Sequence, residues 1–229
     1  APGGRDVPDK CVAVLGGWRE MAAYSFQKDP WSGVTSRNGI PADELTSMLR
    51  GAIRRGEEKT ALAAAYEMYL TSPQLLDRAW RSLLSASVED VGFGAPEAPE
   101  TVWALYGMRR SFDYTDGDQP IFLVYAVRCL CRSRKDRSSG ESAYMLAKRF
   151  AAGYIPEVPD YAYDMHTVQG RELGRGELHF LEEASKVSPQ LESGWVKTLH
   201  DDFIAMCQLE KEASGRPIVE AFLRCEWEY

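Results

Sequence analysis

Apolar residues recur along most of the chain at spacings of three and four positions, the period of a helix with one buried face. Leu45, Leu49 and Ile53 show the pattern in the first such run, which ends at Gly56. The same period predicts further helices over residues 57–71, 73–91, 96–112, 121–130, 138–153, 188–204 and 218–227. No segment alternates with period two between turn signals. The sequence therefore predicts an all-α fold of antiparallel helix pairs with short connections.

Breaks in this pattern suggest three parts. Residues 1–36 form a predicted N-terminal arm, whose aromatic residues make it too apolar for a free tail, so we expect it to pack on the body or on a neighbouring subunit. Residues 37–187 are predicted to form one helical domain, and residues 188–229 a C-terminal helical extension of that domain.

Residues 159–183 depart from the helical pattern because three closely spaced glycines favour backbone shapes that a helix interior disfavours. Their spacing fits no phosphate-binding loop, and no strand precedes them. We expect a shaped connection that docks on the helical body through Tyr161, Tyr163 and Phe180, with Arg171 and Arg175 exposed towards a partner. The residues predicted to form this structural joint are Asp164, His166, Gly170, Gly174 and Gly176.

Composition narrows the class of protein. The 229 residues are 45% apolar and 27% charged, which is typical of a globular chain. No run approaches the roughly 18 apolar residues that span a membrane, and the N-terminus shows no signal-peptide pattern. The five cysteines are scattered over helical patterns, which favours reduced thiols and a cytoplasmic location.

A net charge of −7 argues against nucleic-acid binding by the whole surface, yet one stretch reverses the sign. Only Asp136 and Glu141 are acidic within residues 128–149, and clustered arginines and lysines suit phosphate groups. The alternative is a solvated helix end that pairs with an acidic neighbour. The predicted nucleic-acid or partner contacts are Arg128, Arg132, Arg134, Lys135, Arg137, Lys148 and Arg149, with Arg171 and Arg175 from the glycine-rich segment.

The sequence offers no complete catalytic site. It lacks a G-x-x-x-x-G-K-[ST] loop for ATP, and no zinc-type cysteine knuckle is present. His200-Asp201 resembles the doublet of all-α metal phosphohydrolases, with His166 or His179 as an upstream ligand. No aspartate follows Asp202 to complete such a site. We therefore predict no catalytic residue, metal or cofactor, and keep a metal-dependent phosphohydrolase as the alternative function.

Three stretches in order resemble the C-terminal region of the MgsA-type replication-associated recombination AAA+ ATPases. The first is Glu89-Asp90-Val91-Gly92, followed by Ala95-Pro96. The second is Leu130 to Asp136, with Lys135 in the family's lysine position. The third runs from Asp164-Met165-His166 to Gly176. Val88, Arg134 and Asp136 depart from the family pattern, and the ATPase core is absent.

The resemblance implies an all-α oligomerisation module, similar to the collar of clamp loaders, which forms tetramers in that family and works near stalled replication forks. We accordingly expect a non-catalytic module that assembles with itself. Its expected partners are further copies of the chain and either DNA or a DNA-processing protein.

Overall fold

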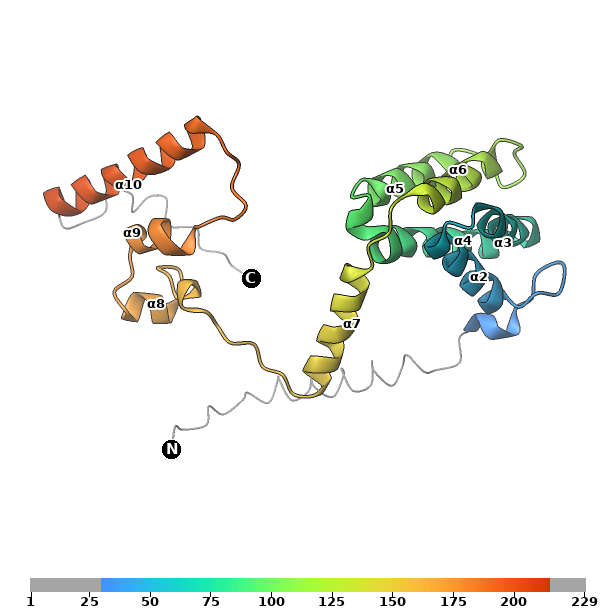
Figure 1. Ribbon diagram of the computed structural model, residues 1–229, viewed down its shortest axis with the longest axis horizontal. Coiled ribbons are helices and arrows are strands. Elements are labelled where there is room, and N and C mark those ends of the chain that lie inside the picture. The colour runs from blue at the N-terminus through green and yellow to red at the C-terminus, as the bar shows by residue number, and fades with distance from the viewer. Residues whose placement is uncertain (1–29, 215–229) are drawn as a thin grey trace. The chain divides into compact units, whose positions relative to one another are not determined.

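A computed structural model of the chain describes residues 30–214. Within these residues the structure holds helices and no strand, so the all-α prediction is confirmed (Figure 1). An isolated bridge between Thr35 and Pro41 is the β-type pairing that occurs there. Most of the predicted arm and the helix predicted over 218–227 lie outside the described residues.

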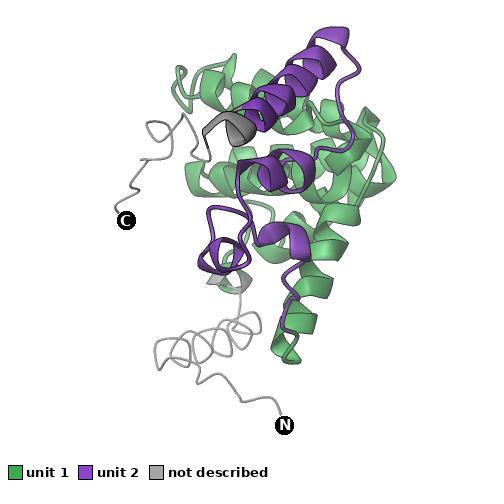
Figure 2. Cartoon of the chain, turned by 90° about the vertical axis from the view of Figure 1, so that its left-hand side faces the viewer, with its two compact units in different colours: residues 1–154 green, residues 155–229 purple. Residues whose placement is uncertain are grey.

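The chain divides after Tyr154 into two compact units (Figure 2). We refer to residues up to Tyr154 as the first unit and to residues from Ile155 as the second unit. This division falls inside residues 37–187, the range predicted as one domain.

Five helices build the core of the first unit, after a 3-10 turn at Pro30–Gly33. They are α2 (Ala42–Arg55), α3 (Glu58–Thr71), α4 (Pro73–Ala86), α5 (Ala98–Arg109) and α6 (Gln119–Arg132). The fully buried side chains include Leu45, Leu49 and Ile53 of α2 and Trp80 of α4. Helix α3 contributes mainly alanines to the core, which lets α2 and α6 pack closely on it.

Local sequence signals set the helix ends. Gly56 adopts φ 70°, and its N–H bonds to the carbonyls of Ala52 and Ile53, which ends α2. The Ser72 hydroxyl accepts the Leu75 N–H at the start of α4, where Pro73 occupies the first turn. These are the positions at which the sequence predicted a boundary.

Helix α4 continues into a π-helical turn, η2 (Ser87–Val91), and a 3-10 turn, η3 (Gly92–Gly94). After α6, the chain passes back beside η2 and enters α7 (Ser138–Ala151). Helix α7 packs against η2 near its first residues and then leaves the bundle (Figure 1).

Up to residue 214, the second unit contains short helical pieces and one longer helix. They are η4 (Asp160–Ala162), α8 (Val168–Glu172), α9 (Glu177–His179), η5 (Phe180–Ala184) and α10 (Gly194–Ser214). The helix predicted from residue 188 begins only at Gly194. The Ser193 hydroxyl accepts the Val196 N–H, so the N-cap lies five residues after Ser188.

Candidate assembly and binding surfaces

The first two of the three family-like stretches lie against each other in the first unit. The Asp136 N–H donates to the Val91 carbonyl at 3.0 Å. Gly92 has φ +49°, and a Cβ there would lie 2.5 Å from the Asp136 carbonyl oxygen. A Cβ at Gly94 would lie 2.6 Å from the Arg134 backbone. Both glycines are therefore required by close backbone approach.

An ionic network stabilises the same junction. Asp90 is fully buried, and its carboxylate lies 2.6 Å from Arg54 Nε and 3.3 Å from Arg137 Nε. Arg50 pairs with the neighbouring Glu89. The network thus joins α2, η2 and the connection from α6 to α7. Sequence reasoning missed it because an Asp after an apolar run does not reveal which arginines fold onto it.

Lys135 points inward rather than towards a ligand. Its Nζ donates to the carbonyls of Leu130 at 2.7 Å and Cys131 at 3.1 Å, and also to Ser133. These carbonyls belong to the C-terminal end of α6, where a cation is favoured. Burial lowers the pKa of the Lys135 amine. The lysine position that carries the family resemblance is therefore a helix cap in this fold.

Two further members of the predicted basic set share one carboxylate. Arg128 Nε lies 2.7 Å from Glu58 Oε1, and Arg132 Nε lies 2.8 Å from Glu58 Oε2. Hydrogen bonds from Arg132 and then Arg128 hold the pKa of Glu58 below its usual value. One carboxylate thus offsets part of the positive charge of these two arginines.

The remaining three cations of the run have no carboxylate partner among the described residues. Arg134 is exposed. Lys148 Nζ lies 4.7 Å from the ring centroid of Tyr144, and the Arg149 guanidinium lies 5.1 Å from that of Tyr154. These positive charges remain available to an acidic partner or to phosphate.

Helix α7 carries an apolar face that the described residues of the first unit do not cover. None of its residues is buried, and Tyr144, Leu146 and Phe150 are 66%, 48% and 51% exposed. At about 100° per residue, Ala143, Leu146 and Phe150 share one side of the helix. Apolar faces of this kind are normally packed against another element. The apolar spacing over residues 138–153 already predicted an amphipathic helix. It could not show that the bundle leaves the apolar face of this helix uncovered.

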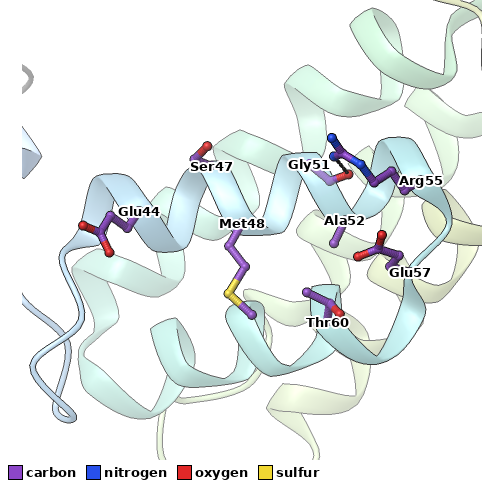
Figure 3. Close-up of a pocket in the computed structure, with 8 residues that line it drawn as sticks. All are labelled: Glu44, Ser47, Met48, Gly51, Ala52, Arg55, Glu57 and Thr60. Atoms are coloured by element: carbon purple, nitrogen blue, oxygen red, sulfur yellow. Dashed lines mark hydrogen bonds between the residues drawn. The ribbon is translucent and has the colours of Figure 1, made fainter.

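An open groove of about 390 Å³ runs between α2 and the start of α3 (Figure 3). Met48 points from α2 towards α3 and is 40% exposed, and Ala52 and Thr60 lie further along the groove. Glu44 stands at one end and Glu57 at the other. Arg55 turns back to donate to the Gly51 carbonyl at 2.8 Å. Neither glutamate has an ion-pair partner in the part of the chain that the structure describes.

In the second unit, the predicted joint is a tight turn around Asp164. Its Oδ1 accepts the His166 N–H at 2.9 Å, and its Oδ2 lies 3.3 Å from His166 Nδ1. Burial opposes ionisation of Asp164, but the hydrogen bonds from His166 outweigh it and lower the pKa of the carboxyl. The His166 ring meets Phe180 edge to face, with centroids 5.0 Å apart.

The three glycines of this segment have different structural roles. A Cβ at Gly170 would lie 1.7 Å from the Asp164 carbonyl oxygen, and the Gly170 N–H donates to the Thr167 hydroxyl at 2.9 Å. Gly174 adopts φ +70°, a left-handed shape, whereas a Cβ at Gly176 would meet open space. The short helix α8 can thus sit on the Asp164 turn only because residue 170 has no side chain.

The two arginines of this segment bond to their own unit. Arg175 Nη2 pairs with the Asp160 carboxylate at 2.7 Å, and Nη1 donates to the Asp160 and Tyr163 carbonyls. Its side chain is 19% exposed, which differs from the exposed side chain that we expected. Arg171 is exposed and donates to the Met165 and His166 carbonyls. Tyr161 is also exposed.

No metal centre emerges from residues 30–214. His200 and Asp201 are exposed on α10, and no three histidine, cysteine or acidic side chains of this range gather so that they could hold an ion. The same residues include no helix with both the length and the apolar character needed to cross a membrane. Comparison of the chain with models of known families and with curated proteins gives no match.

Proposed function

We propose that this chain is a non-catalytic helical module that assembles with further copies of itself. The observation that carries the proposal is α7, an amphipathic helix whose apolar face is left uncovered by residues 30–154 of the first unit. The adjoining family-like stretches at Val91–Gly94 and Arg134–Asp136 also favour it, since the resemblance implies a collar-like bundle of antiparallel helix pairs that forms tetramers. The solution mass of the full chain is the direct test, and a constant monomer mass would refute assembly.

The second part of the proposal is contact with DNA or with a DNA-processing protein. We assign this proposed contact to fewer residues than the sequence did, because Lys135 caps α6 and Arg137 joins the Asp90 network. Arg128 and Arg132 share the single negative charge of Glu58, so together with the exposed Arg134 they keep a net positive charge that can contact phosphate.

Reversing these three charges tests the DNA contact. We expect R128E/R132E/R134E to abolish the salt-dependent binding of a fluorescent DNA duplex that the unmodified chain shows in an anisotropy titration. The matched control is R37E/R81E/R110E, which reverses three exposed arginines elsewhere in the first unit. Equal affinity of the two triple variants, or binding by the unmodified chain that salt does not weaken, would contradict the DNA contact while leaving self-assembly untouched.

A further inference from the structure

We propose that Tyr125 stacks on an unpaired DNA base, and that Arg128 and Arg132 on the same face of α6 bind the adjoining phosphates. This inference rests on the proposed DNA contact and names the form of DNA that the site recognises, a single strand. Tyr125 lies three residues before the basic run that the sequence indicated, so charge clustering alone did not include it.

The outward face of α6 combines an aromatic ring with two arginines. At about 100° per residue, Tyr125, Arg128 and Arg132 lie within about 60° of one another around the helix axis. Leu123 and Val127 project to the opposite side, and both are fully buried in the core of the first unit. The three outward side chains therefore form one stripe, which we call the α6 stripe.

The Tyr125 ring is available to a ligand. It is 56% exposed, and within residues 30–214 it meets no other ring and its hydroxyl forms no hydrogen bond. By contrast, the rings of Tyr69 and Tyr114 pack together, and each hydroxyl bonds to a backbone carbonyl. A base can stack on an open ring of this kind whatever its identity. The bases of a duplex are already stacked on one another, so the ring favours an unpaired base.

Glu58 holds both guanidinium groups but leaves several of their N–H donors unused. Its carboxylate accepts hydrogen bonds from Arg128 Nε at 2.7 Å and from Arg132 Nε at 2.8 Å, with a longer contact from Arg132 Nη2. Both Nη atoms of Arg128 and Nη1 of Arg132 form no hydrogen bond in the part of the chain that the structure describes. Glu58 is less exposed than either arginine. Guanidinium donors that are held in place and remain unused suit phosphate oxygens.

Charge determines which part of α6 a strand can follow. Along the helix axis, Arg128 lies about 4.5 Å beyond Tyr125, and Arg132 about 6 Å beyond Arg128. The exposed Arg134 extends the positive surface after the helix, whereas the exposed Asp118 opposes phosphate at the other end. We therefore expect the strand over the last two turns of α6, with its base on the ring and its phosphates on the arginines.

The test measures binding of single-stranded and duplex DNA by the full chain. The probes are a fluorescent oligothymidine and a fluorescent blunt duplex of the same length, titrated by anisotropy. We expect the unmodified chain to bind oligothymidine more tightly than the duplex. Tyr125→Ala should weaken oligothymidine binding at least about fivefold and leave the Kd for the duplex unchanged. R128E/R132E should weaken binding of both probes, because both carry phosphates.

The matched control is Tyr161→Ala, which removes a tyrosine of similar exposure from the second unit and should leave both affinities unchanged. Substitutions of Tyr125 itself separate stacking from apolar contact. Tyr125→Phe and Tyr125→Trp keep a ring and should retain oligothymidine affinity. Tyr125→Leu keeps apolar bulk without a ring and should lose that affinity, which keeps the test valid if the alanine variant folds poorly.

The outcomes separate the inference from the proposed function. Salt-dependent duplex binding, with oligothymidine affinity unchanged in Tyr125→Ala or Tyr125→Leu, would overturn the stacking site while the proposed DNA contact stands. An equal loss for both probes in Tyr125→Ala would also overturn it, because the ring would then not distinguish an unpaired base. Tighter binding of an oligouridine RNA would overturn the choice of DNA. Failure of the unmodified chain to bind either DNA probe would remove the proposed DNA contact, and the inference with it.

Discussion

Glu58 provides a pH-dependent element at the residue scale. Its folded-state pKa is lowered below 4.5 by the two arginines, so its contribution to stability is fully present above pH 4.5 and is lost as pH falls through the lowered pKa. We therefore expect Glu58→Gln to lower the melting temperature at neutral pH. The difference from the unmodified chain should shrink as pH falls below 4.5 and vanish once Glu58 is protonated in the folded state.

Glu57→Gln is the matched control for this change, because Glu57 is the adjacent exposed acid and has no ion pair among the described residues. Its melting curves should follow those of the unmodified chain at each pH. A Glu58→Gln difference that does not shrink as pH falls below 4.5, or one that Glu57→Gln reproduces, would show that the Arg128 and Arg132 pairs do not act as described. Melting temperatures from circular dichroism are sufficient for the comparison.

Individual side-chain roles were the least predictable feature of the sequence. The clustering of Arg128, Arg132, Lys135 and Arg137 is visible in sequence, but their carboxylate partners are 47 to 74 positions away, and Lys135 bonds to the backbone of a helix end. Glu58, for example, contacts Arg132 across 74 positions. Charge clustering therefore located the cations but could not show that Lys135 caps α6 or that Arg137 joins the Asp90 network.

At the scale of elements, the Asp164 turn and α8 depend on the absence of a side chain at residue 170. We expect Gly170→Ala to destabilise the second unit by about 1–3 kcal/mol or more, because its Cβ would overlap the Asp164 carbonyl. Hydrogen exchange of the amides in residues 160–175 measures the local effect. Gly176→Ala is the control, since a Cβ there meets nothing within 4 Å. Unchanged protection in Gly170→Ala would contradict the described turn.

The helices themselves were largely predictable, for physical reasons that are local. Gly56, Ser72 and Pro73 determine the boundaries of α2, α3 and α4 through φ angle, hydroxyl capping and first-turn geometry. The start of α10 was predicted too early. Ser188-Pro189 and Ser193 both fit the start of a helix, but only Ser193 caps α10. The π-helical form of η2 has no comparable signal in the sequence.

At the scale of the whole molecule, the division after Tyr154 was not predicted. Residues 150–160 contain one glycine and two prolines, and similar clusters occur inside the first unit, so composition does not distinguish a unit boundary from a loop. The uncovered apolar face of α7 could not be predicted from the sequence either. The apolar pattern of 138–153 predicts a helix with one buried side, whereas only the fold reveals that the described part of the first unit does not bury it.

Self-assembly is the central claim at this scale, and the solution mass of the unmodified full chain tests it most directly. Light scattering coupled to size exclusion, run from submicromolar to high micromolar concentration, should give a mass that rises with concentration to a multiple of 25.7 kDa. A mass of 25.7 kDa throughout that range would contradict the account.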